Sequence, residues 1–277
     1  QAGADEPVRA DFEKRCRGDC MMGMGLGLRA AAAAIVLCLA TGGVQAAGNA
    51  EHPLAEHWSF NGIFGHYDRA EAQRGLQIFL EICAQCHGAK YLRYGDLADL
   101  GYDEDQIDAI AAQFEVEDGP DDEGEMFMRA ARPTDTFPEP YANEKAAAAV
   151  NNGKAPPDLS LMVKARHDGA NYIYALMTGY DEPPEELELS DGLTYNPYFP
   201  NHQIAMPQPL WGEDVEYADG TEASIKQEAR DVVTFLAWAS EPGMERRKNM
   251  GLKVMLFVLI MTGLFYATKR KVWKDVH

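Results

Sequence analysis

Two stretches of the chain repeat apolar side chains with the period of an α-helix. Residues 69–82 carry apolar side chains around one face, and Asp68 before them is a residue type that favours a helix N-cap. Residues 225–239 show the same pattern near the other end of the chain. The apolar positions are Leu76, Phe79, Leu80, Ile82, Val232, Phe235, Leu236 and Trp238. Both stretches are therefore predicted to be helices with one buried face.

Shorter helices are predicted between these two. Residues 107–114 have a single apolar edge, and residues 143–150 are rich in alanine and end at the helix-stopping residues 151–153, Asn-Asn-Gly. Residues 161–166 and 171–178 follow, the second ending at a glycine. The elements together predict a mainly α protein.

Three segments lack a helical pattern. Residues 116–125 are almost entirely acidic side chains, Gly and Pro, which is typical of a solvated loop. Residues 132–141 contain three prolines and are predicted to be an extended linker. Residues 214–221 are predicted to form a strand–turn–strand corner with Asp219-Gly220 as the turn.

The longest apolar run lies close to the C-terminus. Residues 251–268 are rich in Leu, Val, Met and Phe, and their only charge is Lys253 near the start. Eighteen residues are just enough for an α-helix to span the hydrocarbon core of a bilayer, and a lysine at its end can reach the interface. A transmembrane helix is therefore expected, with a buried core helix as the alternative.

A second apolar run near the N-terminus is shorter. Arg29 precedes the apolar residues 30–40, and small residues follow up to Ala46 and Ala47. This order of charge, apolar run and small residues is typical of a secretory signal peptide. Residues 1–46 are therefore interpreted as a leader that is removed, and an uncleaved N-terminal anchor is the alternative.

The charge of the chain is strongly acidic. Against 25 Lys and Arg there are 44 Asp and Glu, a net charge of −19, which argues against nucleic acid as a partner and for basic partners. Residues 47–243 alone carry 37 acidic and 12 basic side chains. Residues 95–128 hold 13 acidic residues and no Lys or Arg. Most such runs are only solvated surface, but this one is also a candidate docking face for a basic electron-transfer protein.

One short motif carries recognisable chemistry. Cys83, Cys86 and His87 form Cys-x-x-Cys-His, the attachment signature of a c-type haem, in which two thiols bind the haem and the histidine ligates its iron. Half of a zinc site and a thioredoxin-like dithiol are the alternatives. A zinc site needs further ligands, and no Cys follows Cys86. A dithiol motif is expected beside a βαβ pattern, which does not precede it.

Several blocks resemble one known family. They are Glu125-Met126-Phe127-Met128-Arg129, Asn151-Asn152-Gly153, Pro157-Asp158-Leu159-Ser160, Ala165-Arg166-His167-Asp168-Gly169, Leu176-Met177-Thr178-Gly179-Tyr180 and Tyr195-Asn196-Pro197-Tyr198-Phe199-Pro200. In this order they resemble cytochrome c1 of the bacterial type, the haem subunit of the cytochrome bc1 complex. The resemblance covers about residues 50–274. It implies a class I cytochrome c-like haem domain with long insertions, followed by one C-terminal transmembrane helix.

The resemblance also implies roles for individual residues. One haem c would be bound covalently by Cys83 and Cys86, with His87 as one axial ligand. Met206, in the segment Ile-Ala-Met-Pro, would be the other, and it cannot be chosen by residue type because the chain has 12 Met. The competing candidates are Met162, Met177, His202 and His167. The residues implied to line the haem or meet its propionates are Arg166, Tyr172, Pro156 and Pro157.

The function that the resemblance implies is electron transfer. The chain would accept an electron from the Rieske iron–sulfur protein and pass it to a soluble basic cytochrome c, beside a cytochrome b, in respiratory or photosynthetic proton-translocating electron transport, without catalytic chemistry of its own. A haem enzyme or sensor with a labile sixth ligand, and a membrane-anchored carrier outside a bc1 complex, are the alternatives.

The leader and the apolar run together predict the placement of the protein. Residues 47–243 would be a haem domain on the periplasmic side of a bacterial inner membrane, and residues 244–277 a single-pass anchor with a short cytoplasmic tail.

Because the first and last helices of class I cytochromes cross, Phe79 is expected near Phe235 and Trp238.

Overall fold

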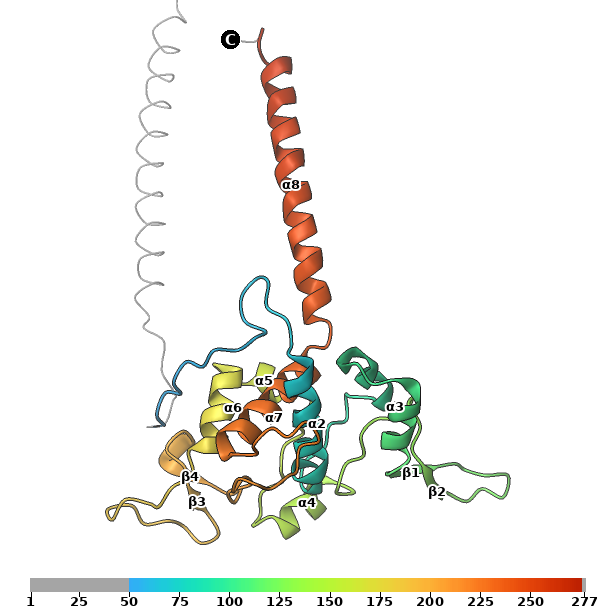
Figure 1. Ribbon diagram of the computed structural model, residues 1–277, viewed down its shortest axis with the longest axis vertical. Coiled ribbons are helices and arrows are strands. Elements are labelled where there is room, and N and C mark those ends of the chain that lie inside the picture. Colours follow the sequence, from blue (N-terminus) through green and yellow to red (C-terminus); the bar gives the residue numbers. More distant parts are fainter. Residues whose placement is uncertain (1–49, 276–277) are drawn as a thin grey trace, which may run out of the picture. The chain divides into compact units, whose positions relative to one another are not determined.

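The computed structural model describes residues 50–275 (Figure 1). The predicted leader and signal peptide lie outside the described residues. The elements in chain order are α2 (Arg69–Glu81), η1 (Cys83–Gln85), η2 (Tyr94–Leu100), α3 (Glu104–Ala111), β1 (Glu115–Asp118), β2 (Phe127–Ala130), α4 (Glu144–Val150), α5 (Met162–Ala165), α6 (Gly169–Thr178), β3 (Thr194–Tyr195), η3 (Pro200–His202), β4 (Gln203–Ile204), α7 (Ile225–Ser240) and α8 (Met244–Val272). The described part is mainly helical, as predicted, and each predicted helix is present within a few residues of its expected bounds.

The core is built on the contact between α2 and α7, which lie against each other at the centre of Figure 1. The Asp68 side chain caps α2 by accepting from the backbone N–H groups of Ala70 and Glu71 at 2.9 and 3.1 Å. The ring of Phe79 lies 5.4 Å from that of Phe235. The ring of Phe235 in turn lies 5.7 Å from that of Trp238, so the expected contact between the first and last soluble helices is confirmed.

A glycine allows the two helices to approach closely. A Cβ placed on Gly75 would lie 2.0 Å from the backbone oxygen of Asp231 and 2.7 Å from the Cβ of Phe235. Real side chains do not tolerate such distances, so the backbone of α7 occupies the volume that any larger residue at position 75 would need.

A buried ion pair joins the same helices. The Arg74 guanidinium on α2 donates to both carboxylate oxygens of Asp231 on α7 at 2.9 Å, and the Asp231 side chain is fully buried. Arg74 also donates to Asp219 at 2.8 Å. One guanidinium therefore ties α2 to α7 and to the loop that precedes α7, with the bidentate geometry that makes Arg–carboxylate pairs strong.

Glu228 is a second buried carboxyl on α7. Its Oε1 accepts from the backbone N–H of Asp214 at 3.0 Å, while its buried Oε2 has no hydrogen-bond partner within the described residues. Burial, reinforced by the nearby Asp214 carboxylate, raises the pKa of Glu228 to about 7. A proton on Glu228 is therefore part of the stable folded state at mildly acidic pH.

The acidic segment is more ordered than predicted. Residues 116–125 were expected to be a solvated loop, but β1 and β2 form an antiparallel hairpin that pairs Val116 with Arg129. Arg129 forms an ion pair with Asp118 and donates to Asp135 at 2.6 Å. This single basic residue just beyond the acidic run neutralises two carboxylates, so the run can fold back on itself.

Two other predictions need correction. The proline-rich residues 132–141 are extended, but they are not a linker, because Phe137 is buried and its ring stacks 4.3 Å from that of Tyr94. The corner at 214–221 contains no strands. Its turn is present, since the backbone N–H of Thr221 donates to the Asp219 side chain at 2.9 Å. Contacts with Arg74 and α7 hold this segment in place of strand pairing.

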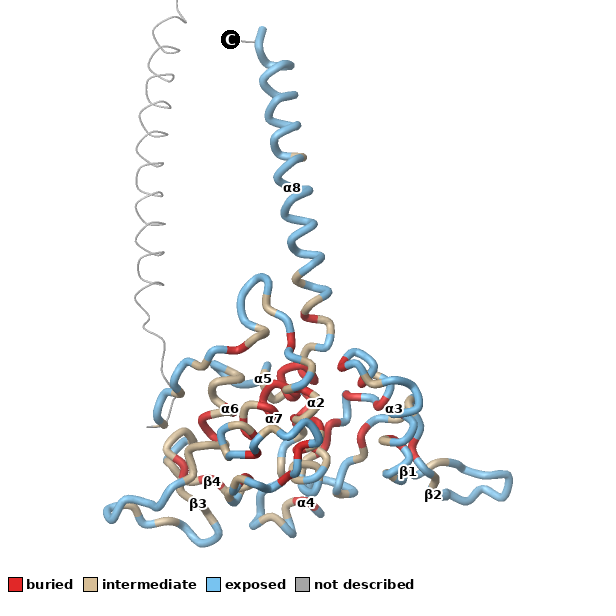
Figure 2. Tube along the Cα trace, viewed as in Figure 1, coloured by how far each residue is buried: buried red, intermediate tan, exposed pale blue. Residues whose placement is uncertain are grey.

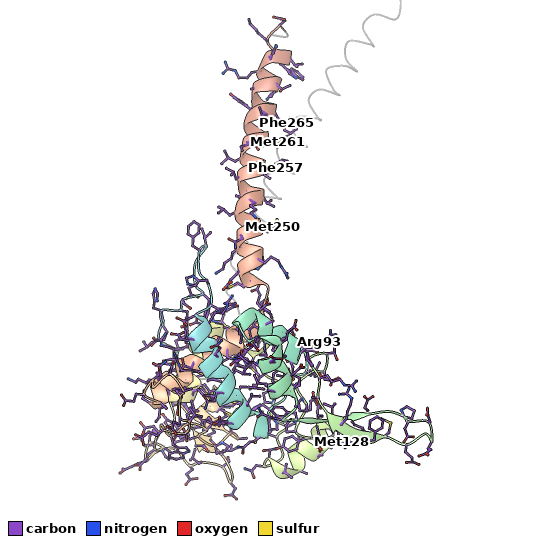
Figure 3. The ribbon with its side chains drawn as sticks, turned by 45° about the vertical axis from the view of Figure 1, so that its right-hand side comes forward. Arg93, Met128, Met250, Phe257, Met261 and Phe265 are labelled. Atoms are coloured by element: carbon purple, nitrogen blue, oxygen red, sulfur yellow. The ribbon has the colours of Figure 1, made fainter. Side chains whose placement is uncertain are left out.

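The α8 helix contains the apolar run and is, within residues 50–275, the one helix long and apolar enough to cross a membrane. Its side chains are exposed along almost all of its length (Figure 2). Figure 3 shows the large apolar side chains of Met250, Phe257, Met261 and Phe265 along it. A continuous apolar surface of this length is unfavourable in water, which fits a lipid environment.

The close approach at Gly75 gives a first testable prediction. Gly75→Ala should lower the free energy of unfolding by about 2 kcal/mol, because overpacking at the upper end of the usual ~1–3 kcal/mol outweighs the roughly 1 kcal/mol that Ala gains over Gly in a helix. Gly243→Ala is the matched control, since its Cβ would meet only the Arg246 guanidinium at 3.5 Å. Denaturation of both variants measures the difference. Equal stabilities would contradict the tight crossing.

The raised pKa of Glu228 gives a second prediction. The folded state holds this proton more tightly than the unfolded chain, whose pKa is near 4.5, so stability should fall as pH rises from about 5 to 7 and level off above. The loss should be on the order of 1 kcal/mol per pH unit at its steepest. Glu228→Gln should remove this slope, whereas Glu216→Gln, at an exposed position, should keep it. Denaturation at several pH values checks this, and parallel profiles for Glu228→Gln and the parent would refute it.

Candidate haem site

The motif follows the C-terminal end of α2. The chain leaves this helix at Ile82 and turns through the short helix η1, where the N–H groups of Cys86 and His87 both donate to the carbonyl of Cys83, at 3.1 and 2.8 Å. Both thiols are free; Cys83 is half-buried and Cys86 is exposed. The turn brings two thiols and an imidazole into one tight loop whose position is set by the packing of α2 on α7.

The surroundings of the thiols disfavour the two other interpretations of the motif. Burial, with a smaller effect of Cys86, raises the pKa of the Cys83 thiol to about 12, whereas a redox dithiol needs a lowered pKa. Within the part of the chain that the structure describes, no three His, Cys, Asp or Glu side chains gather as metal ligands. A zinc site built on Cys83 and Cys86 would need such a group.

The orientation of His87 follows from a backbone contact. Its Nδ1 lies 2.7 Å from the carbonyl oxygen of Pro157. A carbonyl oxygen can only accept a hydrogen bond, so Nδ1 carries the proton and Nε2 keeps its lone pair. Burial lowers the pKa of His87, against the smaller opposing effects of the Pro157 hydrogen bond and of Asp158. The imidazole is therefore neutral and oriented, which is the state in which a histidine binds iron.

Backbone hydrogen bonds join the motif to the segment that orients it. The N–H of Leu159 donates to the carbonyl of Gly88 at 2.8 Å. The N–H of Lys90 donates to the Asp158 carboxylate at 2.9 Å, and the N–H of Tyr91 to the Ser160 hydroxyl at 3.1 Å. Pro157, which is exposed, and its neighbour Pro156, which is half-buried, are held beside the motif by this ladder.

Met206 lies in a separate, well-anchored segment. The strands β3 and β4 pair just before it, and the buried Asn196 braces them by donating to the carbonyl of Leu176 at 2.8 Å and by accepting from Tyr198. The Tyr180 hydroxyl donates to the carbonyl of Met206 at 3.1 Å. Met206 is half-buried, and Ile204 and Leu210 in the same segment are buried. The thioether is thus presented by backbone that is fixed to α6 and its following loop.

The candidate propionate contacts lie together. Arg166 is exposed after α5, and its charge lowers the pKa of the Tyr172 hydroxyl, although burial has the larger effect and raises it overall. Tyr172 in turn contributes to the raised pKa of Tyr180, which is caused mainly by burial. The Tyr180 hydroxyl, which donates to the Met206 carbonyl, links this group of side chains to the Met206 backbone only at that one contact.

Sequence reasoning missed Tyr180 and Asp158 as positioning residues. Both lie in blocks that carry the family resemblance, which was the signal that could have found them. The rival ligand His202 has its Nδ1 3.0 Å from the carbonyl oxygen of Pro197, and Met162 and Met177 are half-buried against the core. The groups gathered at the motif, two thiols and an oriented imidazole, fit the attachment and one axial ligand of a c-type haem.

Known proteins with similar sequences belong to one family. A profile of the Cytochrome C1 family matches residues 58–276. The chain is 46% identical to "Cytochrome c1" of Rhodospirillum rubrum over an aligned stretch of 257 residues; that stretch is 87% of this chain and 94% of that protein. The chain is also 44% identical to "Cytochrome b-c1 complex catalytic subunit, mitochondrial" of Candida albicans over 234 aligned residues, which are 84% of this chain and 81% of that protein.

A third relative is a longer protein. The chain is 43% identical over 255 residues to "Cytochrome b/c1" of Bradyrhizobium diazoefficiens, and the match covers 84% of this chain but 37% of that protein. The present chain therefore matches little more than a third of the length of that protein.

Proposed function

The chain belongs to the cytochrome c1 family, and from this membership we propose that it is the electron-transfer haem subunit of a cytochrome bc1 complex. The observation that carries the proposal is the hydrogen bond between His87 Nδ1 and the Pro157 carbonyl, which leaves Nε2 free to bind iron directly after two attachment thiols. The names of the relatives, cytochrome c1 and b-c1 complex subunit, support the same assignment.

Each residue of the site has a proposed role. Cys83 and Cys86 would attach one haem c covalently, and His87 and Met206 would supply the two protein ligands of its iron. When bound, haem c supplies a one-electron Fe(III)/Fe(II) couple. Two protein ligands leave no position open for a substrate, and a thioether raises the potential relative to a second imidazole.

The propionate end of the haem is assigned to the remaining residues. Arg166 would offer a guanidinium that matches a carboxylate fork, with Tyr172 as a weaker propionate contact. Pro156 and Pro157, beside His87, would provide stiff apolar surface for the haem. The Tyr180 hydroxyl donates to the Met206 carbonyl and would help to hold the thioether in place.

The proposed partners follow from the family of the chain and from the net charge of its haem domain. Electrons arrive from a Rieske iron–sulfur protein and leave to a soluble basic cytochrome c, while a cytochrome b in the same complex handles the quinol. The net charge of −25 on residues 47–243 supports a basic acceptor, because opposite charge raises the rate of encounter.

The proposed topology combines the leader with α8. Residues 1–46 are exported and removed, residues 47–243 lie in the periplasm, and α8 crosses the inner membrane once at about residues 251–268 with its C-terminal end in the cytoplasm. The membrane-spanning character of α8 supports the anchor, and the similarity to a bacterial cytochrome c1 supports the compartment.

Replacement of Met206 tests the ligand assignment. Met206→Leu should lower the midpoint potential by roughly 100 mV or more and open the ferrous form to carbon monoxide, because axial ligands set haem potentials over a range of about 0.8 V. Redox titration with spectra of the purified membrane complex measures both. Met162→Leu and Met177→Leu are matched controls that should leave the midpoint potential unchanged. A lowered midpoint potential in one of these variants, and not in Met206→Leu, would identify that methionine as the ligand instead.

Removal of charge from the loop between β1 and β2, here called the acidic hairpin, tests whether the basic cytochrome c docks there. Asp122→Asn with Glu123→Gln removes two exposed charges at the tip that make no side-chain ion pair within the described residues. Electron transfer to a basic cytochrome c should slow roughly two- to fivefold at low salt, with the difference vanishing at high salt. Glu185→Gln with Glu186→Gln removes the same charge from another exposed loop. Equal slowing in both pairs would show a diffuse effect of net charge and contradict docking at the hairpin.

A further inference from the structure

A short loop before α2 presents apolar side chains to solvent. In the loop of residues 59–66, here named the Ile63–Phe64 loop, the two side chains at the tip are 71% and 80% exposed. The loop is ordered by its own backbone, since the N–H of His66 donates to the carbonyl of Ser59 at 3.1 Å and closes the base. Gly62, with φ at 75°, makes the turn that directs the tip outward.

Both ends of this loop are fixed in the core. The Trp58 side chain is buried, and its indole N–H donates to the Asn171 side chain at 2.7 Å. Tyr67 is also buried, and its hydroxyl donates to the carbonyl of Ala237 at the end of α7 at 3.0 Å. With both ends held in the core, the loop projects from the domain and leaves Ile63 and Phe64 in an exposed position.

The base of the loop contacts the first turns of α8. The Lys248 ammonium donates to the carbonyls of Phe60 and Gly65 at 2.6 and 3.2 Å. The Glu245 carboxylate accepts from the backbone N–H of Tyr67 at 2.8 Å. Figures 1 and 3 show the loop rising beside α8 in the direction in which that helix continues.

This contact sets the height of the loop along the helix. An α-helix rises 1.5 Å per residue, so the apolar run that begins at Gly251 starts about 4.5 Å beyond Lys248. Figure 3 shows the loop beside α8 rising to about the level of Met250, one residue before the apolar run begins. Three basic residues, Arg246, Arg247 and Lys248, lie just before the apolar run, and of these Arg247 is paired with Glu241. Basic residues at this position favour the phosphates of an anionic lipid surface.

We propose that the Ile63–Phe64 loop inserts its tip into the interfacial region of the lipid bilayer beside α8. One spanning helix leaves a soluble domain free to tilt, and a second, shallow contact removes that freedom and fixes the orientation of the domain on the membrane. Aromatic and branched apolar side chains flanked by basic residues are the composition that binds such an interface. Lipid is the chosen occupant because the tip continues the exposed apolar surface of α8, where Met250 and Leu252 are 56% and 50% exposed.

This inference rests on membrane anchoring by α8 and does not depend on the redox role. Nitroxide labels on Ile63→Cys and, separately, Phe64→Cys in the full chain in its native membrane test it. Power-saturation EPR compares collisions with oxygen, which concentrates in lipid, and with a water-soluble nickel chelate. Leu54→Cys, at a position 77% exposed in the preceding segment, is the matched control, and the parent chain treated in the same way supplies the background from its own cysteines.

The proposal expects labels at positions 63 and 64 to collide severalfold more with oxygen relative to the nickel chelate than the label at Leu54. Equal ratios at the three positions would overturn it, because the loop would then lie in water. Exclusion of both reagents would also overturn it, because a protein neighbour would then cover the tip. The haem midpoint potential, measured on the same samples, reports separately on the proposed electron-transfer function.

Discussion

The crossing of α2 and α7 at Gly75 is the constraint on which the rest of the structure depends. The two backbones approach so closely that Asp231 is buried against α2, where only the guanidinium of Arg74 can neutralise it. The same guanidinium reaches Asp219 and so also sets the path of the loop before α7. A burial of charge this complete is costly unless the geometry is held, and steric contact at the glycine holds it.

The position of the haem motif depends on this crossing of α2 and α7. The motif begins at Cys83, two residues beyond the end of α2 at Glu81, so the direction of that helix determines where the thiols and the imidazole lie. Pro157 then orients His87 through a carbonyl group, which no side-chain replacement can remove. Met206 is fixed independently through Asn196 and Tyr180. Two rigid supports from distant parts of the chain suit a proposed electron carrier, because a ligand pair that moves little needs little reorganisation.

The junction between the soluble domain and α8 is also rigid. Tyr67 bonds to the end of α7 and to Glu245, and Lys248 holds the loop that carries Phe64. A flexible linker would let the haem domain swing freely on its anchor. The observed network instead couples the orientation of the domain to that of the helix, which is the arrangement that a fixed place in a membrane complex requires.

Much of this protein was determined by local sequence. The helical period of residues 69–82 and 225–239, the apolar run within α8 and the Cys-x-x-Cys-His motif each depend on neighbours in the chain, so the sequence alone predicted them. Residues 119–125 form an exposed loop as predicted, but the strands that flank them were missed, because their order depends on Arg129, which lies outside the acidic run. The buried Phe137 was likewise assigned to a linker, because proline spacing says nothing about the Tyr94 ring that covers it.

The remaining features were decided only by tertiary structure. Nothing in the local sequence distinguishes the Pro157 carbonyl as the partner of His87, because 70 residues separate the two. The same holds for the bond between Tyr180 and Met206 and for the contact of Lys248 with the Ile63–Phe64 loop. Sequence periodicity reports which face of an element is buried, whereas the partner of each polar group is fixed only when distant elements pack together.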